Sequence, residues 1–136
     1  MEYIAAVDPG REKCGLALMS VTGEVIEQRV VPRREALTYL TAWHRSRPLK
    51  TIVVGNRTGS RQFAQEIEES PLGARVAISL VEEHLSTLEA RERYFKERPR
   101  RGWRRLIPVS LQVPPEPYDD FVAVILGERY LKGKGT

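Results

Sequence analysis

The sequence has few of the residues from which disulfides and zinc sites are built. Its 136 residues include one cysteine, Cys14, and only two histidines. A single cysteine excludes an internal disulfide and predicts a reducing compartment, the cytoplasm. One cysteine and two histidines are also too few for a zinc site of the usual kind. The composition therefore argues against a secreted disulfide scaffold and against a zinc-binding domain.

Long apolar runs are lacking as well. No run approaches the roughly 20 residues that a membrane-spanning helix needs, and no basic region precedes the first apolar run, as it would in a signal peptide. A hydrophobic content of 41% and a charged content of 29% are typical of a globular domain. We expect one domain over residues 1–136 and no membrane partner.

Aspartate is scarce, since only three of the 18 acidic residues are Asp. Asp8 follows the apolar residues 3–7 and precedes Pro9, whereas Asp119 and Asp120 lie near the other end of the chain. A carboxylate at the end of a buried strand is costly to bury unpaired, so Asp8 indicates a functional site. Taken singly, Asp8 could cap the following turn. Asp119 and Asp120 could simply stabilise the amino end of a helix through its macrodipole.

The pattern of apolar residues and breakers predicts an α/β fold. Three strands joined by short turns should form an antiparallel meander, and two later strands separated by helices should run parallel. The result is a mixed five-stranded sheet with helices on both faces, in which the first strand lies beside the fourth. The expected strands are 3–8, 14–20, 24–31, 51–55 and 76–81, and the expected helices are 34–46, 61–69, 86–97 and 119–131.

Basic residues are concentrated in one segment. Residues 91–105 carry eight basic and two acidic side chains, whereas the net charge of the whole chain is only +4. This segment enters a basic, proline-rich loop at about 98–118, and it indicates a polyanion partner. The basic segment could instead be a solvated surface without a partner. Trp103 could instead anchor the loop. The candidate nucleic-acid-binding residues are His84, Arg91, Arg98, Arg100, Arg101, Trp103, Arg104 and Arg105.

Two further acids, Glu82 and Glu83, end the fifth predicted strand, although a solvated strand end would also explain them. If the last helix packs across the sheet, these acids and the three aspartates can converge at one edge. Clustered carboxylates repel one another unless a cation neutralises them, and hard oxygen ligands select Mg²⁺ or Mn²⁺. Two such ions about 3.5–4 Å apart would activate a water and stabilise the leaving oxygen of a phosphodiester. An acidic cluster that binds metal, together with a basic segment that binds the phosphate backbone of a nucleic acid, predicts a metal-dependent endonuclease.

Three motifs resemble the YqgF/RuvX family of the RNase H-like superfamily. Residues 6–10 and 14–18 resemble the first hairpin of RNase H-like resolvases, residues 82–91 resemble the family's Asp-Glu-Arg-Leu-Ser/Thr-Thr-x-Glu-Ala motif, and residues 119–126 resemble its final helix. The resemblance implies an RNase H-like nuclease that matures the 5′ end of small-subunit ribosomal RNA or cleaves Holliday junctions. It also implies that Asp8, Glu83 and Asp119 are catalytic and bind the metal, with Asp120 and Glu82 as further candidates.

Several positions depart from these motifs. The acidic pair begins with Glu82 where the family has Asp, and His84 replaces the family's Arg. The Asp-Pro-Gly turn is closer to the RuvC branch, yet the fourth strand ends at Gly55 and Asn56 and supplies no acid, so the third acid must come from the next strand.

Two alternatives to the nuclease follow from these observations. One is a nucleic-acid-binding module that has lost catalysis. The other is a nucleotide-binding relative of sugar kinases and actin, which need two such domains. The number of metals, the choice between RNA and branched DNA, and a monomer or homodimer stay open, since junction resolution requires two paired sites.

Overall fold

The computed structural model describes residues 1–56, 59–83, 86–98, 114 and 117–134. A five-stranded sheet forms its centre, in the spatial order β3-β2-β1-β4-β5. The strands are β1 (Tyr3–Pro9), β2 (Lys13–Ser20), β3 (Val25–Pro32), β4 (Leu49–Asn56) and β5 (Ala77–Glu82). The helices are α1 (Arg33–Ser46), α2 (Ser60–Glu69), the 3-10 helix η1 (Pro71–Ala74), α3 (Ser86–Glu97) and α4 (Asp119–Lys134).

The predicted sheet topology is confirmed. β1 pairs antiparallel with β2, and β2 pairs antiparallel with β3. On its other side β1 pairs parallel with β4, which in turn pairs parallel with β5. The central strand β1 is therefore covered on both edges, and its carboxyl end lies beside that of β4.

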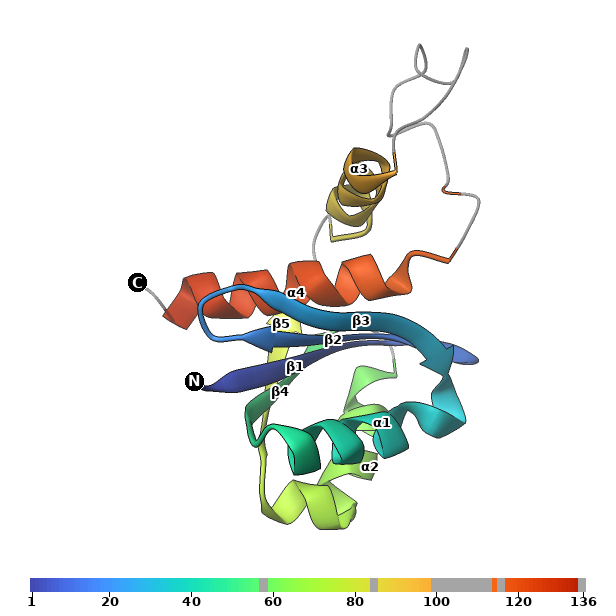
Figure 1. Cartoon of the computed structure of the whole chain (residues 1–136). Coiled ribbons are helices and arrows are strands. Elements are labelled where there is room, and N and C mark those ends of the chain that lie inside the picture. Colours follow the sequence, from blue (N-terminus) through green and yellow to red (C-terminus); the bar gives the residue numbers. More distant parts are fainter. Residues whose placement is uncertain (57–58, 84–85, 99–113, 115–116, 135–136) are drawn as a thin grey trace, which may run out of the picture.

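Helices cover both faces of the sheet, as the sequence predicted (Figure 1). Side chains of a strand alternate between the two faces, so each face has its own core. Ala5 and Val7 of β1 belong to the core under α1 and α2, whereas Ile4 and Ala6 belong to the core under α4. By the same alternation, the side chain of Asp8 lies on the α4 face.

α4 is buried along most of its first half. Its residues from Phe121 to Leu126 are all at most 4% exposed. A helix that is apolar all round needs cover on more than one side. Figure 1 shows this cover, since α4 lies between the sheet and α3. The burial fixes the position of the start of α4, where Asp119 and Asp120 lie.

The structure differs from the expected elements in small respects. Between α2 and β5, where no element was expected, residues Pro71–Ala74 form a short 3-10 helix anchored by the buried Leu72, because proline suits the first position of a helix. The last helix ends at Lys134 rather than Leu131. Most of the loop expected at about 98–118 lies outside the described residues. Among the helices of the described ranges, none is long and apolar enough to cross a bilayer.

The parallel half of the sheet allows a test of the core. Ile52 of β4 is fully buried, whereas Leu80 of the edge strand β5 is 48% exposed. We expect Ile52→Ala to lower the free energy of unfolding by about 2–5 kcal/mol. Leu80→Ala should change the free energy of unfolding by no more than about 1 kcal/mol. Denaturant unfolding of both variants measures the difference. Equal losses in the two variants would contradict the described packing of β4.

Candidate active site

Asp8 lies near the carboxyl end of the central strand, between two glycines. Its side chain is buried, with 5% exposed. Gly15 of β2 is its direct partner in the antiparallel pair. Gly55 of β4 lies one residue beyond Val54, which pairs with Val7, so Gly55 is the neighbour of Asp8 on the other side. The positions that flank Asp8 on this face therefore carry no side chains, and other parts of the chain occupy the space.

The start of α4 fills the space above Gly15. A Cβ atom at Gly15 would overlap the backbone carbonyl of Asp119 and the amide nitrogen of Asp120. Only glycine allows so close an approach of one backbone to another. Because Gly15 is the partner of Asp8, this contact brings the backbone of Asp119 close to Asp8.

The Cys14 thiol is sensitive to both aspartates. Burial raises the pKa of Cys14, and the negative charges of Asp8 and Asp119 raise this pKa further. The guanidinium of Arg33 and a backbone hydrogen bond at Gly10 act in the opposite direction. Both effects agree with the backbone contact at Gly15, which places Asp119 near this end of β1 and β2.

Glu83 fills the space above Gly55. A Cβ atom at Gly55 would lie 2.5 Å from Oε1 of Glu83 and 2.6 Å from its Cδ. Both carboxylate oxygens of Glu83 are buried. The backbone carbonyl of Glu83 accepts a hydrogen bond from the amide of Ser86, at 2.9 Å, where α3 begins. The acid from β5 therefore lies over the end of β4, where β4 itself supplies no carboxylate.

Glu82 and Asp120, the two further candidates, make other contacts. Glu82 is exposed, and its backbone carbonyl accepts a hydrogen bond from Arg129 at 2.9 Å. One carboxylate oxygen of Asp120 accepts a hydrogen bond from Gln28 of β3 at 3.0 Å. Its other oxygen is buried without a hydrogen-bond partner in the part of the chain that the structure describes. Asp119, by contrast, forms an ion pair of 3.6 Å with Lys13 at the start of β2.

The acids at this edge have the chemistry that a hard divalent cation requires. Within the described ranges, no three of the His, Cys, Asp and Glu side chains lie close enough together to hold one ion. Mg²⁺ usually takes only one or two carboxylates, and its other ligands are waters and substrate phosphates. Asp8 together with Glu83 or Asp119 would supply two carboxylates, which are ligands of the type that Mg²⁺ prefers. The assignment of these residues as metal ligands stays a prediction.

Two of the predicted nucleic-acid-binding residues make contacts inside the protein. Nε of Arg91 donates to the hydroxyl of Tyr118 at 3.0 Å, and Arg98 lies over the rings of Tyr94 and Phe121, at 5.1 and 6.0 Å. These arginines tie α3 to the start of α4. The remaining candidates, His84, Arg100, Arg101, Trp103, Arg104 and Arg105, lie outside the described residues.

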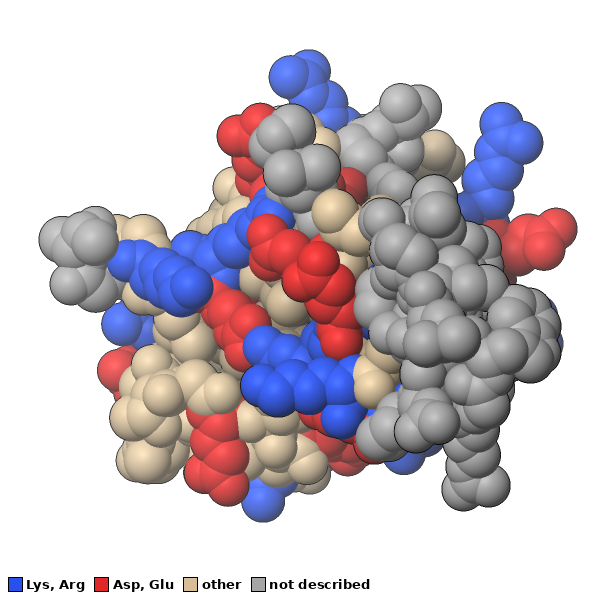
Figure 2. Space-filling view, turned by 90° about the horizontal axis from the view of Figure 1, so that it is seen from above, with Lys and Arg blue, Asp and Glu red and all other residues tan. Residues whose placement is uncertain are grey.

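The surface around α4 carries charges of both signs. Figure 2 shows acidic and basic side chains interleaved on this face. Two of its ion pairs join Arg93 to Glu128 and Arg129 to Glu89, each at 2.8 Å. The described part of this face therefore lacks the single-sign charge that would by itself bind a polyanion.

Comparison with solved structures identifies the fold. RuvC from Thermus thermophilus in complex with a Holliday junction substrate matches with a TM-score of 0.60 at 15% sequence identity, covering 99% of this chain and 96% of that chain. Another structure of Thermus thermophilus RuvC matches with a TM-score of 0.55 at 14% identity, covering 98% and 97%. The fold is RNase H-like. At this level of identity, the likeness concerns the fold alone.

Sequence comparison adds no family assignment. No protein-family profile matches the sequence, and no protein of curated function matches it. The solved structures are of RuvC, so membership of the YqgF/RuvX family specifically stays a prediction.

The contact between Gly15 and Asp119 yields a test. We expect Gly15→Ala to lower the free energy of unfolding by about 1–3 kcal/mol, because the new methyl group must displace the backbone of α4. Gly133→Ala is the matched control, since a Cβ atom there meets nothing within 4 Å. Thermal unfolding compares the two variants. A Gly15→Ala protein as stable as the control would contradict the docking of α4 on β2.

Proposed function

We propose that this protein is a nuclease that cleaves branched or structured nucleic acid at the edge formed by Asp8, Glu83 and Asp119. The observation that carries the proposal is the position of Glu83. Its carboxylate lies over Gly55, so an acid from β5 takes the place of one missing from β4. In this proposal the acids come from three separate parts of the chain, β1, the residue after β5 and the start of α4, at one edge of an RNase H-like sheet.

Each carboxylate has a distinct part in this proposal. Asp8 is the most buried and lies on the central strand, so it fixes the position of the site. The carboxylate of Glu83 lies over Gly55 and the backbone of Asp119 lies over Gly15. In this proposal both acids supply further oxygen donors beside Asp8. Mg²⁺ or Mn²⁺ bound by these residues, as one or two ions, would activate a water and stabilise the leaving oxygen of the phosphodiester.

The positive charges near the site suit a phosphate backbone. Lys13 is half-exposed and lies 3.6 Å from Asp119, so it is placed to contact a phosphate that approaches the carboxylates. The basic segment of residues 91–105 adds further contacts. RuvC in the matched complex binds a Holliday junction, and for this chain we propose either such a junction or a ribosomal RNA precursor.

Replacement of Asp8 tests the proposed site. Asp8→Asn keeps the shape of the side chain and removes its charge, so we expect cleavage to fall at least about a hundredfold. The assay offers a four-way DNA junction and a small-subunit ribosomal RNA precursor in Mg²⁺, in Mn²⁺ and in EDTA. Glu24→Gln, in the exposed turn between β2 and β3, is the matched control and should cleave like the wild type. Cleavage that survives in Asp8→Asn would overturn the site.

A second candidate function is a nucleic-acid-binding module without catalysis. It is favoured by the finding that, in the described ranges, no three potential metal ligands gather around one point. It is also favoured by His84, which stands where the resembled motif has Arg. Binding would then depend on phosphate contacts alone.

Salt dependence together with cleavage separates the two functions. For a binding module we expect affinity for duplex DNA to fall with salt, with a log–log slope of about 0.9 for each phosphate contact. Neither Mg²⁺ nor Mn²⁺ should produce cleavage, and Asp8→Asn should bind as tightly as the wild type. Turnover that copurifies with the protein and is lost in Asp8→Asn would exclude the binding module.

A further inference from the structure

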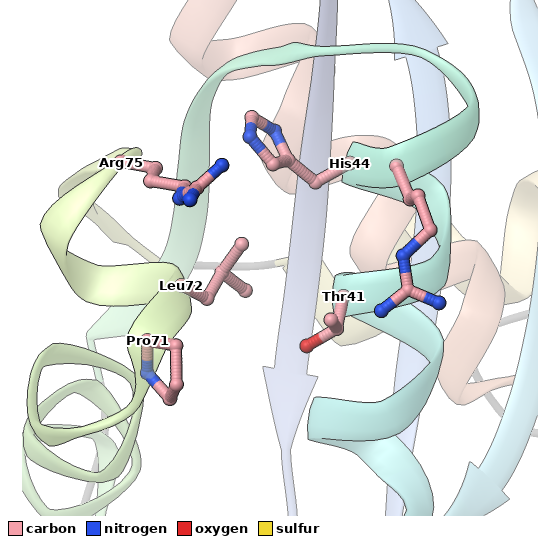
Figure 3. Close-up of a pocket in the computed structure, with 6 residues that line it drawn as sticks. Thr41, His44, Pro71, Leu72 and Arg75 are labelled. Atoms are coloured by element: carbon pink, nitrogen blue, oxygen red, sulfur yellow. The ribbon is translucent and has the colours of Figure 1, made fainter.

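A pocket of about 290 Å³ lies between the last turns of α1 and the 3-10 helix η1 (Figure 3). α1 leads into the start of β4 and η1 leads into the start of β5. The pocket therefore lies at the amino ends of the parallel strands, whereas Asp8 lies at the carboxyl end of β1. Its lining residues are Thr41, His44, Arg45, Pro71, Leu72 and Arg75.

The two segments that meet at this pocket carry charge of one sign. Residues 41–50 and 71–77 contain four cations and no carboxylate. Among the cations, Arg47 packs on the ring of Tyr3 at 5.4 Å, and Lys50 pairs with Glu2 at 3.7 Å. Arg45 and Arg75 line the pocket, are exposed, and form no ion pair with any carboxylate of the described residues. Two guanidinium groups are thus available at one cavity.

His44 adds a donor whose direction is fixed. Its Nδ1 accepts a hydrogen bond of 3.0 Å from the amide of Leu49. The neutral ring then carries its proton on Nε2, which can donate to a ligand. Figure 3 shows the ring of His44 and the guanidinium of Arg75 extending from opposite walls toward the same space. The buried side chain of Leu72, 3% exposed, lies at the base of this space.

A tetrahedral oxyanion suits this arrangement. The arginine fork binds phosphate oxygens through paired hydrogen bonds, and a tetrahedral group has enough oxygens to contact both walls at once. The carboxyl end of α1 carries a partial negative charge of roughly half a unit, which repels an anion. The two positive charges of Arg45 and Arg75 are larger than this partial charge, so the net effect favours an anion.

We propose that this pocket is a phosphate-binding site. The phosphate belongs either to a free or terminal phosphate group or to the backbone of a nucleic acid strand. The site does not depend on the proposed nuclease, because none of its residues lies among the carboxylates at the other end of the sheet.

Pyrophosphate titration, followed by nuclear magnetic resonance in EDTA, tests the proposal in the full chain. We expect saturable shifts of the His44 ring and of the Leu49 amide. Arg75→Gln should raise the dissociation constant about tenfold or more, because a charge-assisted hydrogen-bond pair is lost. The control is Arg61→Gln on α2, which removes the same charge from an exposed position outside the pocket.

A second probe distinguishes the two sources of phosphate. A short DNA strand without a terminal phosphate that shifts the same resonances assigns the site to a nucleic-acid backbone. Shifts with pyrophosphate alone assign it to a free or terminal phosphate. The absence of saturable shifts with both probes would overturn the proposal, as would equal weakening in Arg75→Gln and Arg61→Gln. EDTA prevents metal-dependent cleavage, so neither result depends on nuclease activity.

Discussion

The close approach of α4 to β2 at Gly15 is the contact on which the rest of the site depends. The backbone of Asp119 lies where any side chain at position 15 would stand. The approach is held by the burial of α4 from Phe121 to Leu126 between the sheet and α3. The position of the α4 backbone therefore sets where Asp119 lies, and Lys13 then contacts its carboxylate. Gly55 has the corresponding part on the other side of Asp8, where it leaves room for the carboxylate of Glu83.

α3 carries the first part of the basic segment, residues 91–97, and packs on α4. Its ion pairs with α4, from Arg93 and to Arg129, are partly exposed, and exposed pairs contribute only about 0–1 kcal/mol each. The buried Tyr94 packs edge-on against Phe121, with ring centroids 5.6 Å apart, and such aromatic contacts add to the apolar burial. The attachment of α3 is thus mainly apolar, and the ion pairs of Arg93 and Arg129 add to it.

Much of the fold could be predicted from the sequence because its signals are local. The apolar run at 51–55 between two breakers predicted a buried parallel strand, and the crossover rules then placed β1 beside β4. The sequence could place Asp8, Glu83 and Asp119 at one edge only because the carboxyl ends of parallel strands share an edge. The spaces over Gly15 and Gly55 could not be predicted, because the residues that fill them, Asp119 and Glu83, are distant from these glycines in sequence. Arg91 illustrates the same limit, since its partner Tyr118 is distant in sequence.

The dependence of the site on α4 also sets an order of events during synthesis. The strands that carry Asp8 and the residues leading to Glu83 leave the ribosome well before α4, the last element that the structure describes. Until α4 docks, the apolar face formed by Ile4, Ala6, Ala17 and Met19 has no cover from that helix, and Asp119 is not beside Asp8. A chain in which α4 has not yet docked would thus hold an incomplete set of carboxylates, so the proposed catalytic edge would form only after α4 has been synthesised and has packed on the sheet.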